Sequence, residues 1–227
     1  MTFLERPMSA DSNDVILWRG SGISGANIAN EGLGGSSFDL TSSGASVRTA
    51  TASFWDAFDP NNSEFYKSAD MAFGFSLAAG LTMSCWALAL SPGDLDRVML
   101  KQNNSGWTGS PIYPVAMLVE TTGTLWQATF NTNETISAAR VNGMWTHLGV
   151  TVDAAGTTGE FFVNGSSVGT TSISGGIDLE NNDGPWCLGG RTTTDFFGGK
   201  LWDARVASTV RSAAWFRESY LRGKRFL

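Results

Sequence analysis

The sequence predicts an all-β antiparallel fold that ends in one short helix, and three observations support this prediction. The chain of 227 residues contains 27 glycines and 11% aromatic residues, but only 16% charged residues. This composition is typical of many short strands joined by tight turns. Extended segments are separated by glycine and asparagine turn signals, and a convincing helical pattern occurs only at residues 212–223.

The stretch 141–169 shows the strand pattern most clearly. Apolar side chains alternate with small or polar ones over residues 148–153, which predicts a half-buried strand. Residues 160–163 resume extended character after a loop of small residues. The dipeptide Asn164-Gly165 then predicts a tight hairpin turn into a further strand, because both residue types tolerate positive φ.

Other strands are predicted wherever apolar or β-branched residues run between turn signals. The segment 81–90 is apolar on both parities, which predicts a central strand covered on both faces. Residues 64–69 indicate an edge strand or a loop, and residues 20–35 a turn-rich connection. The remaining strands predicted in this way are 15–18, 36–40, 46–53, 71–77, 97–101, 111–119 and 123–130.

The C-terminal helix is predicted from its caps and its aromatic side. Ser212 is a suitable N-cap and Gly223 a stop signal. Trp215, Phe216 and Tyr220 fall on one side of the helix, as expected when that side is apolar.

Several segments carry a known family pattern in the expected order. They are 82–86 (TMSCW), 145–153 (WTHLGVTVD), 161–165 (FFVNG), 186–190 (WCLGG) and 197–207 (FGGKLWDARVA). Together they resemble the laminin-G-like branch of the concanavalin A-like lectin and glucanase superfamily. The resemblance implies an antiparallel jelly-roll β-sandwich in which 186–190 and 197–207 are strands. The family usually has Asp-Glu where this chain has Trp202-Asp203.

A chain of this length suits one large β domain, so we expect a single jelly-roll domain at residues 15–227. Residues 1–14 have little periodicity and include Pro7, which predicts an extended N-terminal arm. An ordered arm of this composition is pinned on its own domain or on a neighbouring subunit. We therefore expect the arm to contact partners in a homo-oligomer or a lattice.

Charge and hydropathy argue against several partners. Fifteen Lys and Arg against 21 Asp and Glu give a net charge of -6 without a basic run, so we expect no nucleic acid partner. No stretch approaches the length of an apolar membrane span, so we expect no membrane insertion. The first 14 residues lack the charged and apolar regions of a secretion signal, which predicts folding in the cytoplasm.

The two cysteines, Cys85 and Cys187, leave two alternatives open. They can pair only if their strands are neighbours. Buried free thiols are commoner in a chain that folds in a reducing compartment, and this interpretation is favoured.

No catalytic site is expected. Retaining hydrolases on this fold carry an E-x-D-x-x-E run on one strand, and the sequence has no such run. The carboxylate pairs Asp94/Asp96 and Asp178/Glu180 lie in turn-rich sequence instead. The single histidine, His147, suits a structural hydrogen bond better than catalysis or metal binding.

Calcium is the one cofactor that the sequence brings into question. Asp178, Glu180 and Asp183 lie in a loop that also holds two asparagines, and Ca²⁺ binds such oxygen ligands. The loop lacks the order of a self-contained calcium motif, and Asn-Asp-Gly is an ordinary turn signature. We expect a solvated turn and no cofactor, with a calcium site at these three residues as the alternative.

Trp55, Trp107 and Trp186 are the candidate ligand-binding residues. They lie in or next to predicted loops, where a partly exposed indole stacks on a sugar ring or anchors a protein interface. For Trp55, which has phenylalanine neighbours, burial in the core is the favoured interpretation.

These observations favour a non-enzymatic structural or adhesion module of a large assembly. The expected setting is a phage virion, where the chain decorates the capsid or belongs to the tail and contacts other virion proteins through residues 1–14. An extracellular type of fold without an export signal or a disulfide framework motivates this hypothesis. The alternative is a lectin that binds cell-surface glycan, with or without calcium, at a cell surface or outside the cell. A hydrolase with an unconventional site is a third hypothesis, because the fold hosts such enzymes.

Overall fold

The computed structural model describes residues 11–24, 27–42, 65–69, 78–90, 96–102, 114–120, 122–131, 133–177, 184–191 and 195–226. Over these ranges the chain forms fourteen β-strands, one α-helix and short 3-10 turns. The strands are β1 (Asp14–Ser24), β2 (Asn27–Asn30), β3 (Leu40–Ser42), β4 (Tyr66–Lys67), β5 (Leu81–Ala89), β6 (Arg97–Lys101), β7 (Val115–Val119), β8 (Leu125–Phe130), β9 (Glu134–Ala139), β10 (Thr146–Val152), β11 (Thr158–Val163), β12 (Ser166–Ser172), β13 (Trp186–Leu188) and β14 (Gly199–Ala207). The helix is α1 (Ala213–Gly223), and the 3-10 turns are η1 (Gly35–Phe38) and η3 (Lys224–Phe226).

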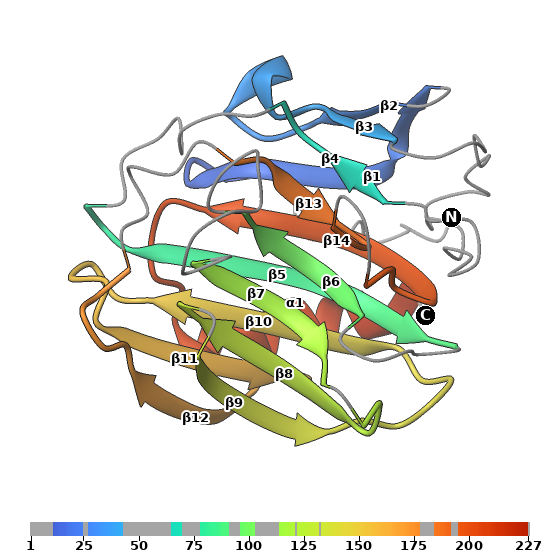
Figure 1. Cartoon of the computed structure of the whole chain (residues 1–227). Helices are drawn as coiled ribbons and strands as arrows, with labels where there is room; N and C mark the ends of the chain where they lie inside the picture. The colour runs from blue at the N-terminus through green and yellow to red at the C-terminus, as the bar shows by residue number, and fades with distance from the viewer. Residues whose placement is uncertain are drawn as a thin grey trace.

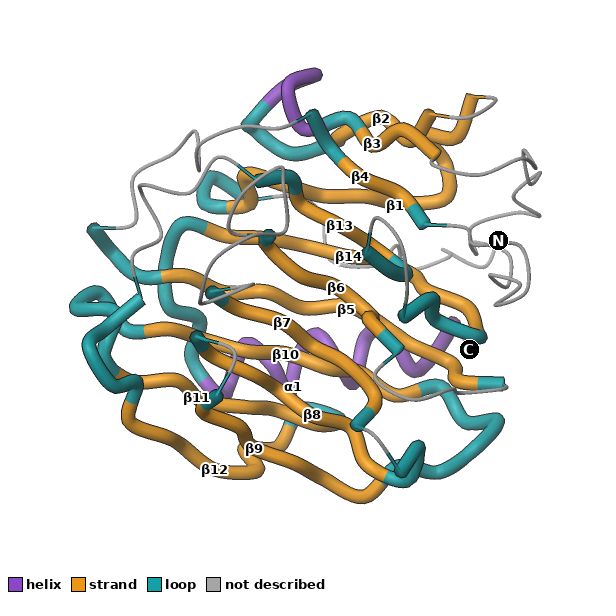
Figure 2. Tube along the Cα trace, in the orientation of Figure 1, coloured by secondary structure: helices purple, strands orange, loops and turns teal. Residues whose placement is uncertain are grey.

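The described strands pair antiparallel in the order β12-β11-β10-β5-β14-β1-β2-β3-β4-β13-β6-β7-β8-β9. This long sheet folds back on itself, so that β6 to β9 and β13 form a front layer over a back layer of β5, β10, β11, β12 and β14 (Figure 1). Strands β9 and β12, at the two ends of the order, lie side by side. Helix α1 crosses behind the back layer (Figure 2). The predicted antiparallel β-sandwich with a short C-terminal helix is confirmed.

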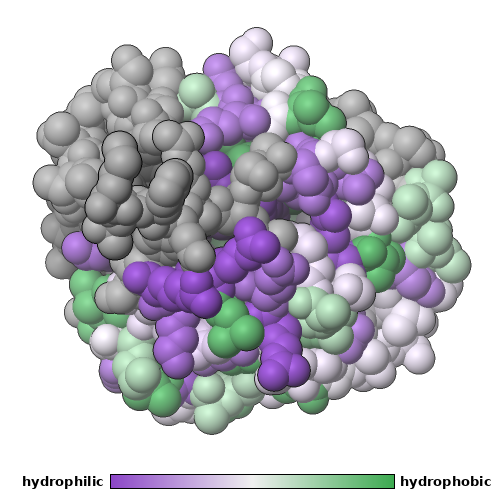
Figure 3. All heavy atoms as spheres, turned by 180° about the vertical axis from the view of Figure 1, so that it is seen from behind, coloured by the Kyte–Doolittle hydropathy of each residue, from purple (hydrophilic) through white to green (hydrophobic). Residues whose placement is uncertain are grey.

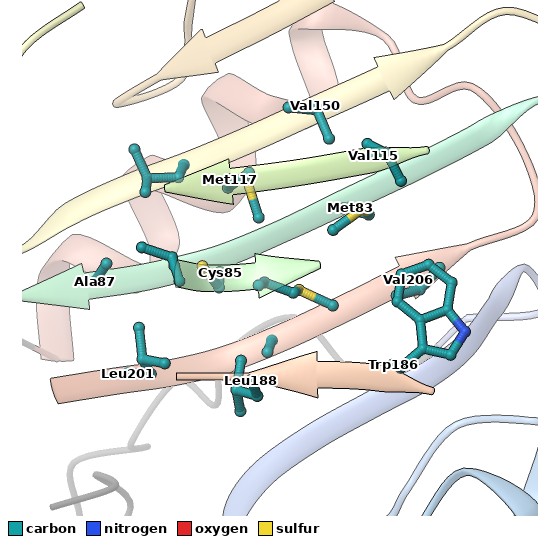
Figure 4. Close-up of a cluster of buried hydrophobic side chains, with 14 of the residues drawn as sticks. Met83, Cys85, Ala87, Val115, Met117, Val150, Trp186, Leu188, Leu201 and Val206 are labelled. Carbon is teal, nitrogen blue, oxygen red and sulfur yellow. The ribbon is translucent and has the colours of Figure 1, made fainter. Parts of the chain in front are cut away.

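The main core fills the space between the layers. Met83, Cys85 and Val150 of the back layer meet Val115 and Met117 of the front layer there (Figure 4). All five side chains are completely buried. Burying a side chain such as valine or methionine contributes about 1.5–3 kcal/mol, so this alternating set supplies much of the driving force for folding.

The back layer is covered on both faces. β5 lies between β10 and β14, as predicted for a strand that is apolar on both parities. The prediction that β10 is half-buried is wrong, because α1 packs on its outer face and every residue of the strand is buried. His147, which the alternation places on the outer side, is therefore only 2% exposed.

The N-terminal third differs most from the prediction. The predicted strand 36–40 is replaced by the turn η1 and only then by β3. The predicted turn-rich connection 20–35 contains the end of β1 and the whole of β2. The predicted strands 46–53 and 71–77 lie outside the described residues, as do residues 1–10 of the predicted arm.

The last residues of the predicted arm are bound to the end of the sandwich by charged side chains, of which Asp14 is buried and Asp11 is partly exposed. Arg211 donates to Asp14 at 3.0 Å and pairs with Asp11 at 2.5 Å. Arg205 of β14 donates to Asp14 at 3.1 Å and contacts both carboxylate oxygens of Asp203. This network joins β1 to β14 and to the segment before α1.

The predicted N-cap of α1 is confirmed. The backbone N–H of Trp215 donates to Ser212 Oγ at 3.3 Å, as expected of an N-cap. The helix ends at Gly223, where a β-carbon would lie 2.5 Å from Trp86 Nε1. Close packing therefore requires a glycine at this position, whereas the C-cap itself is Lys224, from which the backbone continues into η3. None of the described helices is long and apolar enough to cross a membrane.

Cys85 and Cys187 are both buried and are not joined in a disulfide, which confirms the expectation of buried thiols. Cys85 points into the core between the layers (Figure 4). Cys187 belongs to a separate cluster with Leu100 and Leu118, on the outer side of the front layer. Burial raises the pKa of the Cys85 thiol well above its ordinary value, so it stays protonated.

Candidate functional site

The outer side of the front layer presents two rows of side chains that cross its strands. Residues directly opposite each other on paired strands point to the same face of a sheet, so the register defines each row. The first row is Lys67, Cys187, Leu100, Ala116, Thr129 and Thr135. The second is Arg97, Leu118, Gln127 and Ser137. We call the surface that these two rows define the front face.

The middle of the front face is an apolar floor. Leu100, Ala116, Leu118 and Cys187 form a buried cluster with Phe65. Phe196 packs against this cluster, and its ring centroid lies 6.1 Å from that of Phe65. The floor gives the front face a rigid support that is independent of the main core.

A chain of polar groups follows the floor on β8 and β9. Gln127 Nε2 donates to Ser137 Oγ at 3.2 Å, and Thr129 Oγ1 donates to Gln127 Oε1 at 3.4 Å. Gln127 and Ser137 are partly exposed, and Thr135 is exposed. These side chains therefore present amide and hydroxyl groups to solvent in fixed positions. Neutral donors and acceptors of this kind suit a ligand that is rich in hydroxyl groups.

An ion-pair cluster closes the second row. Asp195 Oδ2 forms ion pairs with Arg191 Nε at 2.7 Å and with a guanidinium nitrogen of Arg97 at 3.4 Å. The Arg97 side chain is 3% exposed, whereas that of Arg191 is 24% exposed. Asp195 also has a φ of 62°, which is unusual for a residue with a side chain. The pairs fix the loop before β14 against β6.

Beyond Arg97, the turn between β7 and β8 forms the rim of the front face. The carboxylate of Glu120 accepts from the hydroxyl of Thr122 and from its backbone N–H. These hydrogen bonds, the hydroxyl first, lower the pKa of Glu120 to about 2. Arg140 donates to the carbonyl of Gly123 and lies over the ring of Trp126. Burial lowers the pKa of Arg140.

The structure describes only one of the three predicted tryptophans. Trp55 and Trp107 lie outside the described residues. The expected partly exposed indole at Trp186 is wrong, because its side chain is completely buried (Figure 4). Trp186 shares its parity with Leu188, and both point from β13 into the main core. Trp186 therefore supports the front layer from inside and offers no stacking surface to a ligand.

The predicted calcium ligands, Asp178, Glu180 and Asp183, also lie outside the described residues. Within the described ranges, no group of three or more His, Cys, Asp or Glu side chains is placed to hold a metal ion. The calcium alternative thus stays a prediction.

Sequence reasoning missed the polar groups of the front face because it missed β9. Residues 134–139 alternate in a way typical of a strand: Ile136 and Ala138 pack against the core, and Thr135 and Ser137 take the other side. The alternation is present but its apolar members are few, so the pattern is faint. The pairing of Gln127 with Ser137 depends on the register, which no single segment reveals.

Comparison with solved structures shows the same fold in two carbohydrate-active proteins. The sialidase of Trypanosoma rangeli in complex with 2,3-difluorosialic acid matches with a TM-score of 0.71 and 9% identity, over 95% of this chain and 34% of the sialidase. The chain thus spans about a third of the sialidase. Domain 4 of AbnA, a GH43 extracellular arabinanase from Geobacillus stearothermophilus, was solved in complex with arabinotriose. It matches with a TM-score of 0.63 and 10% identity, over 92% of this chain and 98% of that domain.

Comparison at the level of sequence identifies the family. No curated protein sequence matches the chain. A laminin-G-type family model, described as the Concanavalin A-like lectin/glucanases superfamily, matches residues 60–215, which is more than half of the chain. The match covers β4 to β14 and reaches into α1. The chain therefore belongs to the Concanavalin A-like lectin/glucanases superfamily.

Proposed function

We propose that this chain is a non-catalytic carbohydrate-binding module and that its front face receives the glycan. The observation that carries this proposal is the hydrogen-bonded chain of Thr129, Gln127 and Ser137 beside a buried apolar floor. Because β8 pairs with β7, which carries part of the floor, and β9 pairs with β8, these polar groups are ordered before a ligand arrives. A sugar exchanges its hydroxyl contacts with water for contacts with such groups, and preorganisation lowers the entropic cost.

The comparisons support a carbohydrate as the class of ligand, but they do not identify a particular sugar for this chain. The arabinanase domain has the same extent as this chain and was solved with arabinotriose. The sialidase was solved with a sialic acid derivative, but this chain spans only about a third of it. We therefore carry over the class of ligand and no hydrolytic activity.

The environment of the described carboxylates supports the absence of catalysis. A general acid in a hydrolase needs a raised pKa, usually from burial without a cationic partner. Asp14, Asp195 and Asp203 are each paired with arginine instead. Glu120 has a pKa of about 2, which keeps it ionised. These groups act as structural anions.

A glycan array that includes arabinan and sialylated oligosaccharides tests the proposal. We expect the wild type to bind a defined glycan class, and the double variant Gln127→Ala/Ser137→Ala to bind it at least about tenfold more weakly, because hydrogen bonds of about 1 kcal/mol each are lost. Ser167→Ala is the matched control, since Ser167 donates to Glu160 at 2.5 Å in the exposed β11–β12 hairpin. Absence of binding to every glycan, or equal binding by both variants, would contradict the proposal.

A phage virion is our second candidate for the setting in which the module acts. The favouring observation is that Cys85 and Cys187 are buried thiols in separate clusters, as expected of a chain that folds in a reducing host cytoplasm. Residues 1–14 would then contact other virion proteins, and the module would repeat as a homo-oligomer or on a capsid or tail lattice. Cryo-electron microscopy of particles from the native source tests this setting. A repeating density that fits the sandwich supports it, and particles without the chain contradict it.

A further inference from the structure

Helix α1 is held on the back layer by aromatic rings. Phe216 stacks on Phe162 with a centroid distance of 4.0 Å, and Tyr220 stacks on Trp86 at 5.6 Å. The ring centroid of Trp86 also lies 6.3 Å from that of Trp202 of β14. The interface is therefore an aromatic layer between the helix and three strands.

Glycines let the helix approach closely. A β-carbon at Gly149 would lie 2.1 Å from the ring of Phe216, and one at Gly165 would lie 2.8 Å from the α-carbon of Arg217. At Gly223 it would lie 2.5 Å from Trp86. The docked position is thus specified along the whole length of α1.

His147 lies in the middle of this interface. Its ring is 5.1 Å from that of Trp86 and 6.3 Å from that of Phe216. Nε2 lies 3.3 Å from Ser219 Oγ, whereas Nδ1 has no hydrogen-bond partner among the described residues. The ring is therefore almost fully buried and has one nitrogen that the docked helix does not satisfy.

The groups around His147 do not accommodate a positive charge. On β14, Asp203 favours the charged imidazole and Arg205 opposes it, but Asp203 is already bound to the Arg205 and Arg19 guanidinium groups. On β5, the group that faces His147 is the ring of Trp86, which carries no charge. The residue that α1 offers is the Ser219 hydroxyl, and the charged side chains of α1 are exposed. Burial, as the largest cause, lowers the pKa of His147 to about 4.

The segment before α1 is anchored separately. Thr82 Oγ1 donates to the carbonyl of Thr209 at 2.7 Å and accepts from the backbone N–H of Arg211 at 2.9 Å. Arg211 is bound to Asp11 and Asp14 as well, and hydrogen bonds and charge also lower the pKa of Asp11. These contacts do not involve His147, so they persist when His147 takes up a proton. The segment before α1 then stays attached and acts as the hinge about which α1 moves away from the sheet.

We propose that α1 is an acid-releasable cover of the back layer and that proton uptake by His147 is its trigger. A proton from solvent binds the imidazole when the helix is undocked, and the resulting imidazolium resists burial. Release uncovers Phe162, Trp86 and Trp202. Among the described residues, the back of the molecule has polar and apolar side chains intermixed (Figure 3), so release creates an apolar aromatic surface at this place.

The expected size of the effect follows from linkage. An undocked histidine has a pKa of about 6.5, so undocking is favoured progressively as the pH falls below that value. With a docked pKa of about 4, the undocking equilibrium rises about 80-fold by pH 4.5 and by about 300-fold in the limit of lower pH.

Titration of the single histidine tests the proposal without ambiguity of assignment. We expect the imidazole C–H resonances of the wild type to titrate well below pH 6.5. Hydrogen exchange should show that the amide protection factors within 213–223 fall by up to about 80-fold between neutral pH and pH 4.5. The protection factors of β10 should fall less. His147→Phe keeps an aromatic ring without a titrating nitrogen, so it should retain helix protection.

Two results would overturn the proposal. One is a histidine midpoint near 6.5 with the helix still protected, since this means that the docked interface tolerates the charge. The other is loss of helix protection in His147→Phe with the same pH dependence as the wild type. If the variant does not fold, the wild-type titration and the comparison of α1 with β10 decide the matter.

Discussion

The ring of Phe216 fills the space over Gly149, so that a β-carbon added at Gly149 would lie 2.1 Å from Phe216 Cε1. We therefore predict that Gly149→Ala destabilises the protein by about 1–3 kcal/mol, the usual cost of overpacking a filled interior. Chemical denaturation followed by far-UV circular dichroism measures this loss. Phe216→Leu in the same chain should relieve part of it, because the leucine side chain leaves room for the methyl group. Additive effects of the two substitutions would contradict a direct contact.

Arg205 holds two buried carboxylates, and its loss should be costly. Arg205→Met leaves Asp14 with only Arg211 and Asp203 with only Arg19, so we expect a loss of up to the roughly 3–5 kcal/mol that a broken buried pair costs. Equilibrium unfolding in urea measures the change. Arg222→Met is the matched control, since Arg222 and Glu218 form a pair that is about half exposed. We expect the control to change stability by less than about 1 kcal/mol. Similar losses in both variants would argue against the buried network.

The hydrogen bonds to Glu120 should appear in the acid stability of the protein. The pKa of Glu120 is about 2 in the folded chain against 4.5 ordinarily, so its stabilising contribution is complete above pH 4.5 and is lost as the pH falls towards 2. Thr122→Val removes the hydroxyl donor and should raise the pKa of Glu120. Carboxyl-carbon NMR titration measures this shift. Thr135→Val, on the exposed outer side of β9, should leave the titration of Glu120 unchanged, and an equal shift in both variants would contradict the assignment.

The thiols should be inert in the folded protein. The thiolate is the reactive form of cysteine, and Cys85 and Cys187 are both completely buried. We expect Ellman's reagent to detect no thiol in the native state and both thiols after denaturation. A thiol that reacts rapidly in the native protein, or an intact mass lower by the two hydrogens of a disulfide, would contradict this prediction.

Much of the fold could be predicted because the repeat of apolar and polar residues along the sequence indicates where strands and the helix form. β5 is apolar on both parities and lies between two strands under a helix, as its sequence indicates. The N-cap Ser212 is a local signal and was predicted as such. β10 shows the limit of this reasoning: the glycine and polar residues on its outer side suggest solvent exposure, yet they make room for α1. A small residue is compatible both with a solvent-exposed strand face and with a face covered by a helix. Only the tertiary contact distinguishes these two cases.

The candidate site was less accessible to sequence reasoning. Trp186 was expected at the surface because it follows a polar loop, but its parity with Leu188 turns it inward. Gln127 and Ser137 were not singled out, because neither residue type marks a site in isolation. They become a candidate only when the register of β8 and β9 brings an amide and a hydroxyl together beside the floor. Chemistry that depends on pairing between strands is invisible until the pairing is known.

NMR mapping tests whether the glycan binds at the front face. The isotope-labelled protein is titrated with the oligosaccharide that binds most tightly on the array, and the shifts of backbone and side-chain amides are followed. We expect the largest changes at the Gln127 side-chain amide and along β8 and β9, with α1 unaffected. Changes confined to α1 or to the β11–β12 hairpin, with the Gln127 amide unmoved at saturation, would contradict binding at the front face.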